Sequence, residues 1–106
     1  MRRTMLKSKI HRVPVTQCDL NYNGSITIDR ALCKKAGLLE FEKVDVYNCN
    51  TGARFSTYVL LGRKGQLCIN GAAARLAHPG DRVIIASYAD FDEAECAAHK
   101  PVVLTF

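Results

Sequence analysis

Residues 43–61, KVDVYNCNTGARFSTYVLL, decide the fold class of this chain. Apolar and polar side chains alternate with a period of two on both sides of Asn50-Thr51-Gly52, which is typical of a tight turn. Because successive side chains of a strand point to opposite faces, this alternation predicts a β-hairpin with one buried face. We expect its strands over 43–48 and 54–61.

Shorter signals flank the hairpin on both sides. Upstream we expect a strand over 4–15, a polar turn over 19–25, a strand over 26–28 and a two-turn helix over 30–36. Asp29 is the N-cap of that helix and Gly37 follows its last turn. Downstream we expect a strand over 66–69, a short helical segment over 72–76, a turn over 78–81, a strand over 82–89 and a terminal strand over 101–106. Many short strands with one or two short helices predict a mainly β fold, a small barrel.

Length and charge narrow the class of protein. The 106 residues suffice for one domain, and 48% hydrophobic with 24% charged residues is typical of a soluble globular protein. No apolar run approaches the roughly 18 residues that cross a bilayer, and no leader pattern is visible, so we expect a cytoplasmic protein. The net charge of +5 equals the number of cations near the N-terminus: Arg2, Arg3, Lys7, Lys9 and Arg12. Such a cluster suits nucleic acid, a small anionic substrate or a solvated strand face, and composition does not distinguish these.

The sulfur and imidazole side chains do not have the spacing of a metal site. The five cysteines are Cys18, Cys33, Cys49, Cys68 and Cys96. They are odd in number and include no Cys-x-x-Cys pair, and the three histidines do not cluster with them. We therefore expect no metal and no disulfide framework, but reduced and mostly buried thiols.

The polar turn contains one bond with chemistry of its own, Gly24–Ser25. Because Gly24 has no side chain, the Ser25 hydroxyl can approach its carbonyl carbon, and a strained turn favours this approach. The resulting N-to-O acyl shift gives an ester, which can eliminate to dehydroalanine and hydrolyse to a pyruvoyl group with loss of ammonia. The dipeptide alone is weak evidence for this chemistry, because Asn-Gly-Ser is a common turn, so the ordinary turn stays open beside it at this point.

Five segments across the chain narrow the choice: MLKSKIHRV (5–13), LNYNGSITID (20–29), TGARFSTY (51–58), INGAAAR (69–75) and PGDRVII (79–85). Together they resemble the aspartate 1-decarboxylase family. The resemblance implies a small double-psi β-barrel that forms a homotetramer with active sites between subunits. It also implies a carboxy-lyase that converts L-aspartate to β-alanine and carbon dioxide for pantothenate biosynthesis.

The resemblance further implies a single domain over 1–106 that cleaves itself between Gly24 and Ser25. The products would be a short chain 1–24 and a long chain 25–106, in which Ser25 becomes the covalent pyruvoyl group that forms a Schiff base with the substrate. Whether a helper protein assists this maturation stays open.

Roles for further residues also follow from the resemblance. Tyr58 would donate a proton to the decarboxylated intermediate, Thr57 would contact the substrate and the cleavage site, and Arg54 and Lys9 would hold substrate carboxylates. Gly71, Ala72 and Ala73 would line the substrate pocket, with His11, Tyr22 and Asn70 in supporting roles.

Elementary chemistry agrees with two of these roles. A phenol such as Tyr58 still carries its proton at neutral pH, whereas a carboxylic acid would have lost it. Arg54 offers a carboxylate the planar fork that a lysine lacks. Strand alternation places Arg54 and Tyr58 on one face, with Thr57 pointing the other way unless a bulge redirects it.

Two features depart from the family pattern. The part of the chain after Ala89 is shorter and less similar, and Tyr47 stands where many relatives have tryptophan. We interpret Arg2, Arg3 and Lys7 as surface cations.

Two alternatives belong to other classes of protein. One is a small basic β-barrel that binds nucleic acid, with the N-terminal cations on phosphates and stacking residues that would be Tyr22, Tyr47, Phe55 and Tyr58. The other is a catalytically inactive barrel with a structural role.

Overall fold

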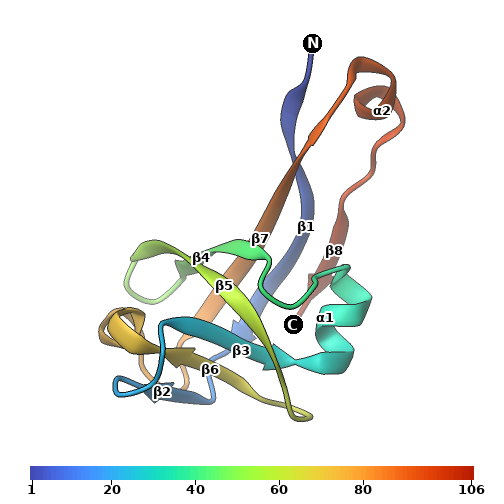
Figure 1. The fold of residues 1–106 in the computed structure, drawn as a ribbon. Coiled ribbons are helices and arrows are strands. Elements are labelled where there is room, and N and C mark those ends of the chain that lie inside the picture. The colour runs from blue at the N-terminus through green and yellow to red at the C-terminus, as the bar shows by residue number, and fades with distance from the viewer.

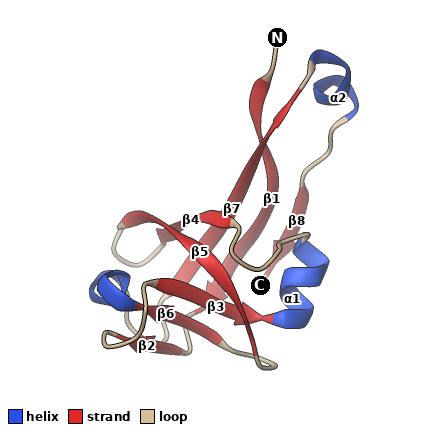
Figure 2. Cartoon of the chain, viewed as in Figure 1, coloured by secondary structure: helices blue, strands red, loops and turns tan.

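The computed structural model describes all 106 residues. Eight strands form one sheet in the order β2-β6-β3-β5-β4-β7-β1-β8, and Figure 2 shows how little of the chain is helical. The strands are β1 (Arg3–Pro14), β2 (Gln17–Asp19), β3 (Ser25–Asp29), β4 (Lys43–Asn48), β5 (Arg54–Gly62), β6 (Leu67–Asn70), β7 (Arg82–Phe91) and β8 (Val102–Thr105). The helices are α1 (Arg30–Ala36), the 3-10 helix η1 (Gly71–Leu76) and α2 (Glu93–Ala98).

The sheet closes through its first two strands. β1 pairs with β7 near one end of the strand order, whereas β2, which follows β1 along the chain, pairs with β6 at the other end. The short connection is itself hydrogen-bonded, because the Val15 nitrogen donates to Asp81 O at 2.8 Å and the Thr16 nitrogen to Leu67 O at 2.9 Å. The result is the small double-psi β-barrel that the resemblance implies.

The hairpin of β4 and β5 is confirmed. Its antiparallel register is unbroken from Lys43 opposite Tyr58 to Tyr47 opposite Arg54. Val44 and Val46 face the barrel interior and are fully buried. Around them lies a core of β-branched and aliphatic side chains that includes Ile10, Ile26, Ile28, Val59, Leu67, Ile69, Val83 and Ile85. This rigid core positions the polar ends of β3, β5 and β6.

Both predicted caps of α1 are present. The Asp29 carboxylate accepts hydrogen bonds from the backbone nitrogens of Ala31 at 2.8 Å and Leu32 at 3.3 Å, and Gly37 has a left-handed φ of 72°. A further hydrogen bond from the Gly65 nitrogen reaches the same carboxylate at 2.8 Å. These backbone donors, that of Gly65 above all, lower the pKa of Asp29 because they stabilise its charged form.

The C-terminal part differs most from expectation. β7 runs to Phe91, two residues beyond the predicted end, and the acidic stretch then begins α2, which the sequence pattern does not predict. Asp92 and Glu95 form a reciprocal capping box at its start. The terminal strand is confirmed as β8, which lies parallel to β1. The N-terminus and α2 lie at the same end of the arm that β1 and β7 extend from the barrel (Figure 1).

The cysteines are all free thiols, but they are less buried than expected. Cys33 and Cys68 are buried, Cys18 and Cys96 are partly buried, and Cys49 is exposed. The expectation of mostly buried thiols was therefore wrong for Cys49, which lies in the hairpin turn.

Candidate active site

Ser25, the first residue of β3, is completely buried. Its hydroxyl donates a hydrogen bond to Asn23 O at 2.9 Å and accepts one from Nδ2 of Asn70 at 2.9 Å. Asn70 is the last residue of β6 and lies directly opposite Ser25 in the antiparallel register. A nucleophilic oxygen is thus fixed in one rotamer, away from water, beside the bond that precedes it.

The backbone of Gly71 packs against Gly24, on the exposed side of that bond. A Cβ atom on Gly71 would lie 2.6 Å from Gly24 Cα and 2.8 Å from its nitrogen, and Gly71 has a φ of +72°. Both the contact and the left-handed conformation therefore require glycine. A Cβ atom on Gly24 would meet nothing within 4 Å, so the space around this residue is open.

A pocket of about 210 Å³ opens beside this site, and its lining is mostly polar. The lining residues are Gln17, Asp19, Tyr22, Thr27, Gln66, Cys68 and Asn70. Ala72 and Ala73 follow Gly71 in η1, Ala72 exposed and Ala73 partly buried. A larger, more apolar pocket of about 370 Å³ lies next to α1 at the far end of β3, but it contains none of the predicted site residues.

Tyr58 lies next to Ser25 on the neighbouring strand. β3 and β5 run parallel from Ile26 opposite Val59, and Ser25 and Tyr58 are the residues directly before this first pair. The Tyr58 side chain is 37% exposed. Thr57 is less exposed and the hairpin register has no bulge, so the prediction that Thr57 faces away from Tyr58 is confirmed.

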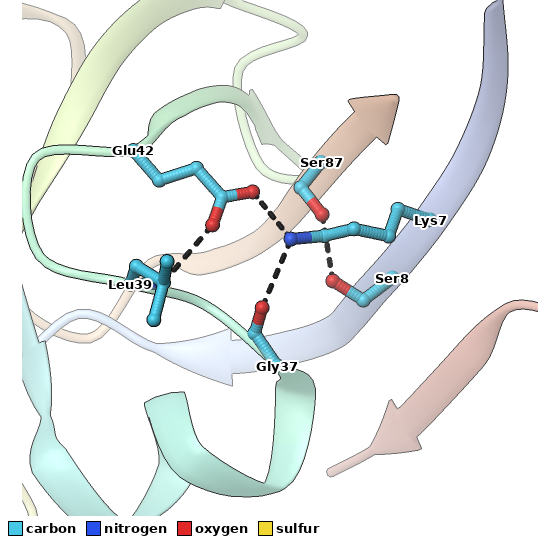
Figure 3. Close-up of polar contacts among 6 residues, drawn as sticks. All are labelled: Lys7, Ser8, Gly37, Leu39, Glu42 and Ser87. Carbon is cyan, nitrogen blue, oxygen red and sulfur yellow. Dashed lines mark hydrogen bonds and ion pairs between the residues drawn. The ribbon is translucent and has the colours of Figure 1, made fainter. Parts of the chain in front are cut away.

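The loop before β4 is fastened beside Tyr58. Figure 3 shows Lys7 Nζ donating to Gly37 O at 2.9 Å and pairing with Glu42 Oε2 at 2.5 Å, while Glu42 Oε1 accepts from the Leu39 nitrogen at 3.0 Å. Lys7 was expected to be a surface cation. That expectation was wrong, because the loop folds back over this side chain and leaves it only 28% exposed.

The same loop reaches the strand that carries Tyr58. Phe41 has a φ of +70°, and its nitrogen donates to Val59 O at 2.7 Å, while the Val59 nitrogen donates to Glu42 O at 3.0 Å. The rings of Phe41 and Tyr58 have centroids 6.5 Å apart. The loop therefore fixes the backbone next to Tyr58 and brings the Phe41 ring near the Tyr58 ring.

Arg54 lies at the other end of β5, with its guanidinium 3.8 Å from the centroid of the Tyr47 ring. The Tyr47 hydroxyl donates to Asp45 Oδ2 at 3.3 Å and lies 3.0 Å from the Tyr88 hydroxyl. The hydrogen bond with Tyr88, burial and the Asp45 carboxylate raise the pKa of Tyr47 well above its usual value, so Tyr47 stays a donor. Both ion pairs of the chain involve other cations, Arg3 and Lys7. The edge of the guanidinium is therefore free to bind an anion.

A single chain does not bring Arg54 or Lys9 to Ser25. Arg54 is four residues from Tyr58 along a strand, which corresponds to about 13 Å. Lys9 is opposite Ala86, Ala86 is opposite Asp45, and β5 lies beyond, so Lys9 is three strands away, about 14 Å. Both figures are backbone separations, and neither side chain forms a hydrogen bond with Ser25 within the chain.

The remaining candidates are placed as follows. The Tyr22 side chain is 53% exposed at the rim of the pocket. His11 lies in the irregular part of β1 beside β8, and its Nδ1 is buried without a hydrogen-bond partner. Neither Tyr22 nor His11 forms a hydrogen bond with Ser25.

Two contact residues were not predicted. Thr27 Oγ1 lies 3.1 Å from Nδ2 of Asn70, and the Cys68 thiol donates to Oδ1 of Asn70 at 3.0 Å. Only the pairing of β3 with β6 reveals them, and the alternation pattern of 67–70 carries no signal of it.

Other classes of site find little support. No group of three or more His, Cys, Asp and Glu side chains could hold a metal ion. Neither α1, η1 nor α2 has the length and apolar character of a membrane-spanning helix. The nucleic-acid alternative is not favoured, because Arg54 covers one face of Tyr47 while Arg3 and Lys7 are paired with Glu93 and Glu42.

Comparison with known proteins also indicates a decarboxylase, and the similarity extends over the full chain. A family model described as aspartate decarboxylase matches residues 1–106. The chain is 56% identical over 101 residues to aspartate 1-decarboxylase of Campylobacter hominis, an alignment that covers 95% of this chain and 89% of the relative. It is 57% identical over 102 residues to aspartate 1-decarboxylase of Persephonella marina, covering 94% and 73%. The family model over residues 1–106 and relatives more than 50% identical show that the chain belongs to the aspartate decarboxylase family.

Proposed function

We propose that this chain is a carboxy-lyase that converts L-aspartate to β-alanine and carbon dioxide, and so supplies pantothenate biosynthesis. The observation that carries the proposal is the environment of Ser25: a buried hydroxyl held by Asn70 and Asn23, directly after an exposed Gly24. It occurs in a chain that matches the aspartate decarboxylase family over residues 1–106.

The residues around Ser25 fit formation of a pyruvoyl group there. The Ser25 oxygen attacks the Gly24 carbonyl carbon, the Ser25 nitrogen leaves it, and an ester replaces the peptide bond. Loss of the Ser25 Cα proton then breaks the Cβ–O bond, which releases Gly24 as a free carboxylate and leaves dehydroalanine at residue 25. One water molecule hydrolyses its imine tautomer to the ketone and releases ammonia. The products are chain 1–24 and chain 25–106.

The side chains near the site suit these steps. Asn70 Nδ2 stabilises negative charge on the Ser25 oxygen as the Cβ–O bond breaks. The backbone of Gly71 packs directly on Gly24 and blocks its movement in that one direction. A ketone at residue 25 would condense with the amino group of aspartate and accept the electron pair that decarboxylation releases.

The outer residues would bind aspartate and supply a proton. Tyr58, which like Ser25 comes directly before the first paired residues of β3 and β5, would donate from its hydroxyl the proton that replaces the lost carboxylate. Ala72 and Ala73, which follow Gly71 in η1, would line the substrate pocket. Thr57 would contact the substrate, although it lies on the opposite face of β5 from Tyr58. Arg54 binds the remaining carboxylate with its free edge.

The distances within one chain support a homotetramer with shared sites. Arg54 lies about 13 Å along β5 from Tyr58, and Lys9 lies three strands, about 14 Å, from Ser56, so a neighbouring subunit would contribute them more readily than the same chain. His11 and Tyr22 would then act at the same interface.

Mass spectrometry of the untreated protein tests the proposal. We expect two chains separated at Gly24–Ser25, the long one blocked to N-terminal sequencing, reactive toward hydrazine and able to release carbon dioxide from L-aspartate. Ser25→Ala should remain one inactive chain. A wild-type protein that stays whole and inert to hydrazine, alone and with a cell extract that could supply a helper, contradicts the proposal. Cleavage without release of carbon dioxide would indicate the inactive barrel.

A further inference from the structure

Cys68 is a buried thiol beside the proposed cleavage site, and no role has so far been given to it. In the antiparallel register Ser25 is opposite Asn70 and Thr27 is opposite Cys68. Residues two apart in a strand share a face, so these four polar side chains form one group between β3 and β6. Cys68 and Asn70 are 4% and 3% exposed, so water competes little for their hydrogen bonds.

The amide of Asn70 sits between hydroxyls on one side and the thiol on the other. Its Nδ2 donates to Ser25 Oγ at 2.9 Å and to Thr27 Oγ1 at 3.1 Å, and its Oδ1 accepts from Cys68 Sγ at 3.0 Å. A hydroxyl can donate or accept, so the two hydroxyls would tolerate either orientation of the amide. A thiol is a donor and only a weak acceptor, so Cys68 determines which end of the amide faces Ser25.

Burial keeps Cys68 in the form that this arrangement needs. Desolvation, with smaller contributions from Asp19 and Cys18, raises the pKa of the Cys68 thiol above its usual value. The thiol is therefore protonated at neutral pH and can donate to Oδ1. A thiolate would instead attract Nδ2 and turn the amide around.

The orientation of the amide matters for cleavage. With Nδ2 toward Ser25, an N–H group faces the oxygen that becomes negative as the Ser25 Cβ–O bond breaks. With Oδ1 toward Ser25, a carbonyl oxygen would repel the same charge and would take the hydroxyl proton away from Asn23 O. The first arrangement favours elimination and the second opposes it.

We propose that Cys68 is a positioning residue for self-cleavage, whose thiol proton holds the Asn70 amide with its nitrogen toward Ser25. The inference rests on the proposed cleavage at Gly24–Ser25. Cys68 forms no hydrogen bond with Gly24 or Ser25, and it acts through Asn70.

The test compares three variants by the rate of cleavage. Freshly synthesised full-length precursor is followed over time by intact-mass spectrometry. Cys68→Ala, which lacks the donor, should cleave about tenfold more slowly than wild type, in keeping with the loss of one buried hydrogen bond. Cys68→Ser keeps a donor, but its hydroxyl can also accept, so it holds the amide less strictly and should cleave faster than Cys68→Ala and more slowly than wild type.

Cys33→Ala is the matched control. Cys33 is an equally buried thiol, 1% exposed, whose sulfur lies 3.8 Å from Ile28 O and outside the group around Asn70. This variant should cleave at the wild-type rate even if it melts at a lower temperature. If Cys68→Ala does not fold, Cys68→Val carries the same comparison, because it fills the space without a donor.

Three results would overturn the inference while leaving the proposed function intact: Cys68→Ala cleaving as fast as wild type, Cys68→Ser cleaving as slowly as Cys68→Ala, or Cys33→Ala slowing cleavage equally. A wild-type chain that never cleaves overturns the proposed function itself, and the inference with it.

Discussion

The surroundings of Ser25 and the outer face of β4 and β5 differ in burial and in how many of their polar side chains have hydrogen-bond or ion-pair partners within the chain. Ser25 and Asn70 are buried, and their hydrogen bonds are all made within one chain. Arg54 is exposed on the outer face with no acidic partner, and Tyr58 is 37% exposed. The first region is complete in itself, whereas the second is open.

The contrast matches the two kinds of chemistry proposed for this chain. Cleavage acts on a bond of the chain itself, so its groups can be preorganised in the folded monomer. Decarboxylation acts on a free anion, which needs an accessible cation and, at these distances, a second subunit. The two regions should therefore respond separately to substitution.

The largest expected change is recovery of activity in mixed assemblies. Ser25→Ala keeps Arg54 but has no site for the ketone, while Arg54→Gln keeps Ser25 but lacks the carboxylate-binding fork. Each variant alone should release little or no carbon dioxide from aspartate, whereas coexpressed chains with separable tags should be active in the doubly tagged fraction. If that fraction is as inactive as its parents, the site is not shared between subunits.

Arg54→Lys should impair decarboxylation at the outer face of β4 and β5 without affecting self-cleavage at Ser25. The charge remains but the bidentate fork is lost, so kcat/KM for aspartate should fall about 100-fold, mostly through KM. Cleavage at Gly24–Ser25 should proceed at the wild-type rate. Arg63→Lys, in the exposed turn between β5 and β6, is the control and should change neither quantity.

Gly71→Ala should damage the buried region first. A Cβ atom 2.6 Å from Gly24 Cα would displace the bond to be cut, so the rate of cleavage should fall by about tenfold or more. Gly52→Ala has a similar φ of +80° but open space around the added atom. It should lose about 1 kcal/mol of stability to the same backbone strain and cleave normally. Equal cleavage rates in the two variants would show that contact with Gly24 is unimportant.

The smallest effect concerns the end of β3 farthest from the chemistry. The pKa of Asp29 is lowered in the folded protein, chiefly by the Gly65 nitrogen, so the folded state binds fewer protons than the unfolded state below the usual value of 3.8. The free energy of unfolding should therefore decline as pH falls from about 5 through this range. Asp29→Asn should make the decline shallower in denaturant titrations, with cleavage unaffected at neutral pH. An unchanged slope would assign the acid sensitivity to other carboxylates.

Much of the fold could be predicted because its signals are local. The hairpin follows from period-two alternation around Asn50-Thr51-Gly52, and α1 follows from Asp29 and Gly37 at its ends. α2 could not be predicted from periodicity, since it is short and has no buried residue. Its capping box, Asp92 with Glu95, was the one readable signal.

The site was harder to predict from the sequence than the fold, because it depends on pairing between segments that are distant along the chain. Ser25 meets Asn70 only because β3 pairs with β6, and nothing in either segment specifies that partner. The resemblance implied that Ser25 and Asn70 belong to one site. It did not imply Cys68, which in the sequence looks like one more apolar strand residue. Lys7 was misassigned for the same reason, since Glu42 reaches it from a loop 35 residues away.

The closure of the barrel gives the proposed cut an unusual consequence. Chain 1–24 would hold β1, which lies between β7 and β8, and β2, which lies against β6. Once cleaved, it would become a bound peptide ligand with strand contacts at both ends of the sheet. The mature enzyme would then be a naturally split protein, whose working lifetime depends on how slowly that peptide dissociates.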